Sequence, residues 1–71
     1  MYEEAILDFS KVIELNPKHS LAYDNRSICM LKGKMDKVAA CKDIKMAASL
    51  GLKNRIDWLN SPKGAWCRDL N

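Results

Sequence analysis

The chain has 71 residues, a net charge of +3, and 48% apolar and 30% charged residues. A chain of this length buries only about 60% of its unfolded surface, so it builds one small core, which excludes most enzyme folds. No apolar run reaches the roughly 18 residues that indicate a membrane span, and three glycines and two prolines argue against collagen, disordered linkers and turn-rich β architectures.

The first predicted element is an amphipathic helix over residues 2–15. Asn16 and Pro17 end it, because the residue before a proline is disfavoured in the helical region. Apolar residues recur along it at spacings of three and four, which indicates one buried stripe. The stripe consists of Ala5, Ile6, Phe9, Val12 and Ile13.

Two longer helices follow. One is predicted over residues 20–32, with Ser20 as its N-cap and Gly33 as its C-terminal stop. The next is predicted over residues 36–50, where the Asp36 side chain can cap the first turn. Both carry apolar rows that can face a common core.

Gly51 separates these helices from a short fourth helix over residues 53–60, which carries Trp58. Residues 61–71 are predicted to be a tail outside the helical unit 1–60. No segment alternates with the period of two that strands require. The predicted fold class is therefore all-α, with short loops that make neighbouring helices antiparallel.

The cysteines give little support to a metal site or a disulfide framework. Cys29, Cys41 and Cys67 are odd in number and form no Cys-x-x-Cys pair, and His19 is the only histidine. Cys29 and Cys41 are expected to fill buried helix positions, and Cys67 to be an exposed thiol in the tail. This pattern indicates a reducing, cytoplasmic location. We expect no metal and no cofactor.

The sequence also repeats itself. When the first helix is placed on the third at an offset of 35 residues, small residues fall on small ones and large apolar residues on apolar ones. An offset of 34 places Phe9 on Asp43, which is unfavourable because a core position does not readily become a charge. The matching pairs are Ala5 with Ala40, Asp8 with Asp43, Phe9 with Ile44, Val12 with Ala47 and Leu15 with Leu50.

These residues resemble the tetratricopeptide repeat (TPR) family. Residues 2–9 (YEEAILDF) and 13–17 (IELNP) look like the second helix and exit of a repeat, and residues 22–27 (AYDNRS) like the start of the next. Residues 40–51 (ACKDIKMAASLG) are similar to the second helix of bacterial members, and residues 53–60 to the helix that covers the last repeat. The resemblance implies an antiparallel helix-turn-helix repeat, a fragment of an α-solenoid.

Members of this family are implied to bind peptides or proteins in a groove lined by the first helix of each repeat. Asn25 matches the asparagine that, in some members, contacts a peptide's C-terminal carboxylate; an amide supplies directed donors without burying a charge. The resemblance implies a protein-interaction module without catalysis, and no catalytic motif is present. The implied partner-binding residues are Leu21, Asp24, Asn25, Ile28, Leu31 and Lys32.

Two alternatives remain open. The resemblance implies a helix before residue 1, so the first-helix stripe Ile6, Phe9 and Ile13 lacks its usual partner. A structural role is then possible, in which this stripe caps an array or drives self-association into a homo-oligomer. The other alternative is weak nucleic-acid binding, because residues 32–71 carry nine bases and four acids. No membrane partner is expected.

Overall fold

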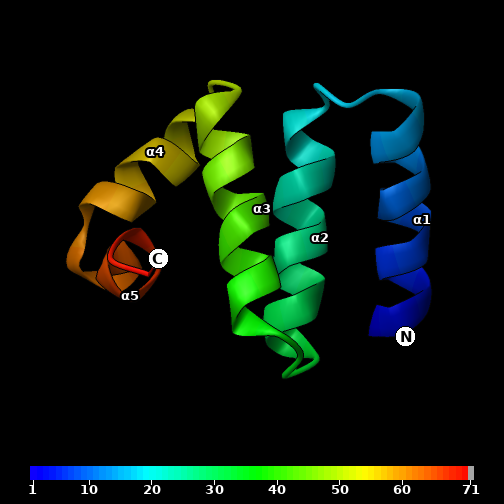
Figure 1. Cartoon of the computed structure of the whole chain (residues 1–71), viewed down its shortest axis with the longest axis horizontal. Helices are drawn as coiled ribbons and strands as arrows, with labels where there is room; N and C mark the ends of the chain where they lie inside the picture. The colour runs from blue at the N-terminus through cyan, green and yellow to red at the C-terminus, as the bar shows by residue number, and fades with distance from the viewer. Residues whose placement is uncertain (71) are drawn as a thin grey trace.

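The computed structural model describes residues 1–70, and its helices stand side by side in a row (Figure 1). The described residues contain no strand, which confirms the all-α fold class, and the four main helices lie where the sequence predicts them. The elements are α1 (Tyr2–Leu15), α2 (Ser20–Lys32), α3 (Lys37–Ser49), α4 (Lys53–Asn60), the 3₁₀ helix η1 (Pro62–Gly64) and α5 (Ala65–Arg68).

The order of the helices in space determines which of them have neighbours on both sides. In Figure 1, α1 forms one edge, α2 and α3 stand in the middle, and α4 and α5 close the other end. Helix α1 packs on α2, whereas α3 packs on α2, α4 and α5. The largest part of the core therefore lies around α2 and α3, on the rows of small and apolar residues that the sequence shows there.

The helix starts follow capping chemistry. The Asp36 carboxylate accepts hydrogen bonds from the N–H groups of Val38 at 2.9 Å and Ala39 at 3.3 Å, which confirms its predicted role. The prediction for Ser20 is wrong. His19 caps α2, and its Nδ1 accepts from the N–H of Ala22 at 3.2 Å. Ser20 already belongs to the first helical turn, so its side chain is one position too late.

The helix ends differ from each other. Gly51, which follows α3, has a φ of 97°, a left-handed value that glycine adopts without steric strain. Gly33, which follows α2, has an ordinary φ of −79°, and the left-handed residue is the next one, Lys34, with a φ of 55°. In the α2–α3 turn, the left-handed residue that reverses the chain is therefore Lys34, one residue after the glycine.

Positions of α1 and α3 that align at the offset of 35 residues are buried to different degrees. In α3, Ala40 and Ile44 are fully buried. Their counterparts in α1, Ala5 and Phe9, are only half-buried, although Phe9 was expected in the core. The reason is that α3 has neighbours on several sides and α1 packs on α2. The fully covered apolar residues are Ala22, Tyr23, Ala40, Cys41, Ile44, Ala47 and Cys67.

The segment predicted to be a tail is folded over its described length. Residues 61–70, which we call the strap, form η1 and α5 and pack on α3 and α4. Cys67 is wholly buried and forms a disulfide with Cys41, so the expectations of an exposed thiol and of no disulfide are wrong. An odd number of cysteines argues against disulfides only if all of them must pair. Here Cys29 stays free and the other two form the bond.

No helix within residues 1–70 is long and apolar enough to cross a membrane.

Candidate functional site

Helix α2 presents one exposed row of side chains. Leu21, with 52% of its surface exposed, begins the row, and Asn25 and Lys32 are also exposed. Ile28 lies between them and is half-buried. Their spacings of four, three and four residues place all of them on one face of a helix. We call these four residues the α2 row.

The other two predicted partner-binding residues do not belong to the row. Asp24, which the resemblance implied as a partner-binding residue, is 7% exposed and forms an ion pair with Arg55 of α4. Leu31 packs against the apolar cluster around Ile44. Asp24 and Leu31 are seven residues apart and so share a second face of α2, which the molecule itself covers.

A buried charged network fixes α2 between its neighbours. The Arg26 guanidinium donates to both carboxylate oxygens of Asp43 on α3, at 2.7 and 2.8 Å, and to the Ser10 hydroxyl on α1 at 3.0 Å. Asp43 is 5% exposed, although it lies between Lys42 and Lys45 in the sequence, a pattern typical of a solvated helix face. Such two-pronged pairing is geometrically specific, and it sets the positions of α1, α2 and α3 relative to one another.

The same contacts control the ionisation of Arg26. Hydrogen bonding to the Asp43 carboxylate raises the pKa of Arg26, and burial of the guanidinium opposes this in part. The Arg26 side chain also lies over the Tyr23 ring, 5.8 Å from its centre. Arg26 therefore remains charged wherever the protein is folded near neutral pH.

A second charged pair fixes α4. Besides binding Asp24, the Arg55 guanidinium lies 5.0 Å from the ring centre of Trp58. Neither arginine was predicted to be a structural residue. Both arginines lie within predicted helices, and a charge that the packing of helices covers needs a partner.

The stripe expected to drive self-association is partly covered. Ile6, Phe9 and Ile13 are half-buried on the side of α1 that packs on α2. The sequence indicated that this stripe lacks a partner, whereas in the structure α2 covers part of it. None of the residues Tyr2–Leu15 is fully buried, however. The exposed large apolar residues at this edge are Met1, Tyr2, Leu7, Val12 and Leu15.

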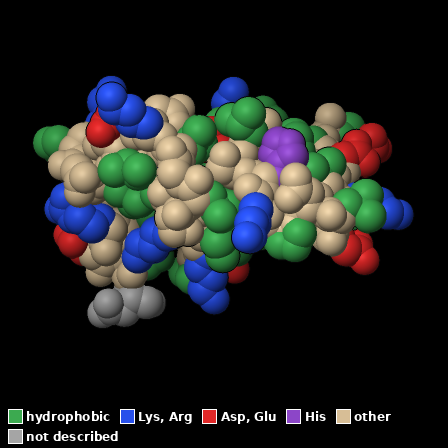
Figure 2. Space-filling model, turned by 90° about the horizontal axis from the view of Figure 1, so that it is seen from above, with side chains coloured by type: hydrophobic (Ala, Val, Ile, Leu, Met, Phe, Trp, Pro, Cys, Tyr) green, Lys and Arg blue, Asp and Glu red, His purple; other side chains and the backbone are tan. Residues whose placement is uncertain are grey.

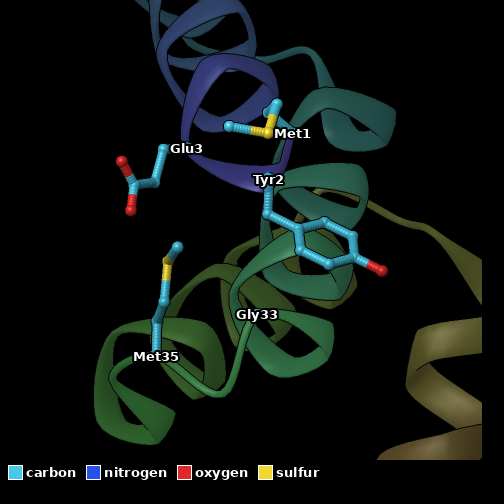
Figure 3. A pocket seen from close by; sticks show the side chains of 5 residues that line it. All are labelled: Met1, Tyr2, Glu3, Gly33 and Met35. Carbon is cyan, nitrogen blue, oxygen red and sulfur yellow. The ribbon is translucent and has the colours of Figure 1, made fainter.

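Two cavities open on the surface. One of about 240 Å³ lies between the start of α1 and the α2–α3 turn; Figure 3 shows Met35 extending from that turn toward Glu3 and Met1. Its remaining lining residues are Tyr2 and Gly33. The other, of about 90 Å³, is bounded by Val38, Cys41, Lys42, Lys45 and Leu70.

Neither cavity shows a constellation for catalysis or metal binding. Glu3 is the only carboxylate among the lining residues of the two cavities, and no histidine lines either. Within residues 1–70, no group of three histidine, cysteine or carboxylate side chains could hold a metal ion.

Charge is distributed unevenly along the row of helices. Figure 2 shows basic side chains spread over the whole length of the molecule and acidic side chains at both of its ends. Four acids and one base lie in α1, which makes this edge negative.

No protein-family model, no curated protein and no solved structure matches this chain.

Proposed function

We propose that the chain is a TPR-like fragment of a helical repeat protein and acts as a protein-interaction module, binding a peptide or protein segment along the α2 row. The observation that supports this most is the row itself, which is exposed on a helix held in place on several sides. Arg26 ties α2 to α1 and α3, and Asp24 ties it to α4. A surface on a rigid element loses little conformational freedom when it binds.

The chemistry of the α2 row fits an extended peptide with alternating apolar contacts. Leu21 and Ile28 offer apolar surface at two points, and Asn25 lies between them. The Asn25 amide can donate to and accept from a peptide backbone or a terminal carboxylate. Lys32 at the end of the row favours a negative group. Asp24 and Leu31 are left out of this site, because their contacts within the molecule occupy them.

The disulfide between Cys41 and Cys67 removes the basis for predicting a reducing, cytoplasmic location, because that prediction depends on unpaired cysteines.

A displayed library of random peptides with free C-termini tests the proposal. Binders selected on the wild-type chain are retested on Asn25→Ala and Ile28→Ala, each of which should weaken binding about tenfold. Asp57→Ala, an exposed change on α4, is the matched control and should leave binding unchanged. If no peptide is selected, or if the control weakens binding as much as the row variants do, the α2 row is not the binding site.

Self-association is a second candidate function. It is favoured by helix α1, which forms an uncovered edge of the molecule. Ala47 of α3 is fully buried, whereas its repeat counterpart Val12 of α1 is exposed. A second copy of the chain could cover that edge.

Equilibrium sedimentation over a range of concentrations tests this candidate. A dimer that is lost on Val12→Ser but kept on Lys11→Ala, a neighbouring exposed change, would support it. A wild-type chain that stays monomeric at millimolar concentration would exclude it.

A further inference from the structure

The strap covers an apolar cluster that no other segment covers from that side. Cys67 and Leu70 of the strap meet Cys41 and Ile44 of α3, and Ile44 is completely shielded from solvent. Leu31, Trp58 and Leu59 complete the cluster. If the strap moved away, the apolar surface between α2, α3 and α4 would be exposed to water.

Apart from the backbone, the disulfide is the one covalent tie between the strap and the rest of the described residues. The only buried side chain of the strap is that of Cys67; the other buried residue, Gly64, has none. Helix α5 has four residues, a single turn, which is not stable as an isolated helix. The described ion pair of the strap, between Arg68 and Asp69, lies within it and is exposed.

Further contacts lie at the rim of the strap. Arg68 donates to the backbone oxygen of Leu59 at 3.3 Å, and the Lys37 ammonium lies 6.0 Å from the ring centre of Trp66. Trp66 meets Trp58 edge to face with 6.0 Å between ring centres, and 39% of its surface is exposed. Lys45 donates to the backbone oxygen of Leu70 at 3.0 Å. Contacts of this kind are individually weak and open to solvent.

A small cavity beside these contacts borders Cys41, one half of the disulfide, which is itself 2% exposed. The cavity of about 90 Å³ reaches Cys41, and two lysines, Lys42 and Lys45, stand at its edge. Cationic side chains favour the thiolate form of a nearby sulfur, and the thiolate is the species that attacks and leaves in disulfide exchange.

We propose that the Cys41–Cys67 disulfide is a redox latch, and that its reduction releases the strap and uncovers the cluster around Ile44. The reductant is a dithiol. Its thiolate attacks the sulfur of Cys41, the bond to Cys67 breaks, and Cys67 leaves as a thiolate that takes up a proton. The second thiol of the reductant then attacks the mixed disulfide and frees Cys41. Two electrons and two protons pass to the protein, and the dithiol becomes a disulfide.

The latch is independent of the proposed peptide binding, since it depends on contacts of the strap and not on the α2 row. It would nevertheless change the neighbourhood of α2, because Leu31 is part of the covered cluster.

The two tryptophans of the chain, Trp58 and Trp66, report directly on the latch. Dithiothreitol is added to the folded protein, free thiols are counted after quenching in denaturant, and tryptophan emission and amide hydrogen exchange are followed. We expect the thiol count to rise from one to three, and the emission to shift to longer wavelength. Amides of residues 62–70 should lose protection about tenfold or more, while those of α2 and α3 change much less.

Two variants separate the bond from other effects. Cys67→Ser changes only the strap, and should show the released state without reductant and no response to it. Cys29→Ser keeps the disulfide, and should respond as the wild type does.

Three results would overturn the proposal. In the first, the thiol count reaches three while the strap stays protected. In the second, α2 and α3 lose protection together with the strap, which would make the bond a support of the whole fold. In the third, the disulfide resists reduction until the chain is unfolded.

Discussion

At the scale of single residues, the Arg26–Asp43 pair is the interaction whose loss has the clearest consequence. Asp43→Ala leaves the guanidinium partly buried without its carboxylate, and breaking a buried pair in this way costs about 3 kcal/mol of unfolding free energy. Arg26 has 20% of its side chain exposed, so water relieves part of the penalty. Urea unfolding followed by far-ultraviolet circular dichroism measures the loss.

Asp8 supplies a matched control for this prediction. It occupies the repeat position equivalent to Asp43 but is exposed on α1. We expect Asp8→Ala to change the unfolding free energy by no more than about 0.5 kcal/mol. Equal effects of the two changes would mean that the Arg26 contacts contribute little to stability.

The direction of the Arg26 shift also fixes how this stability depends on pH. The pKa of Arg26 is raised in the folded state, so the guanidinium holds its proton more tightly there than in the unfolded chain. A raised pKa contributes stability below the unfolded pKa, and that contribution is lost only as the pH rises through the folded pKa. The ionisation of Arg26 should therefore add no pH dependence to unfolding near neutrality.

At the scale of elements, the helix caps give a graded test. Asp36→Ala removes the acceptor of two backbone N–H groups, and we expect a loss of about 1 kcal/mol. Ser20→Ala should be nearly neutral, because His19 is the cap of α2. Thermal melts of both variants decide this; a larger loss for Ser20→Ala would contradict the assignment of His19.

The packing of the strap on α4 depends on Gly64. A Cβ at this position would overlap the backbone of α4 at the carbonyl oxygen of Trp58 and come within 2.8 Å of the Cα of Leu59. Gly64→Ala should therefore push η1 away from α4 and separate Trp66 from Trp58. The emission of the two tryptophans measures this.

Gly51 is the contrasting glycine. A Cβ there meets nothing within 4 Å, but its φ of 97° is unfavourable for other residues. Gly51→Ala should cost about 1 kcal/mol by backbone strain, without changing tryptophan emission. If both glycine variants shift the emission alike, close packing of η1 on α4 is not the cause.

The elements also show what local sequence can and cannot predict. Helices α1 to α4 can be predicted from local sequence, because the signals that begin and end them lie within a few residues of the helix. These signals are the apolar spacing, Asp36, Pro17 and the glycines. The strap cannot be predicted in this way. Its place depends on Cys67 meeting Cys41, 26 residues away, and three cysteines allow three different single pairings.

Buried charges were missed for a related reason. Asp43 lies between Lys42 and Lys45 in the sequence, and Asp24 stands beside Asn25 and Arg26, so both carboxylates look solvated. Their partners, Arg55 and Arg26, are 31 and 17 residues distant, and only the packing of the helices brings them together. The spacing of Leu21, Asn25, Ile28 and Lys32 on one face of α2 follows from local sequence, whereas the burial of Asp24 and Leu31 depends on contacts with α4 and the apolar cluster around Ile44.

At the scale of the whole molecule, the row of helices is closed at one end and open at the other. The closed end has α4, the strap and a covalent bond between Cys41 and Cys67, whereas the open end is α1, which carries no fully buried residue. Stability should therefore fall along the row toward α1, since local opening is easiest where few apolar groups are covered.

Native-state hydrogen exchange tests this gradient. Amides in the middle of α1, around Phe9, should exchange at least about tenfold faster than those around Ile44 of α3, although the two positions are equivalent in the repeat. Raising the protein concentration separates the two candidate functions. If a second copy covers α1, protection around Phe9 should rise with concentration, and Val12→Ser should abolish the rise. If no second copy binds α1, its hydrogen exchange should be independent of protein concentration, because the apolar surface of α1 is then exposed to water in every molecule.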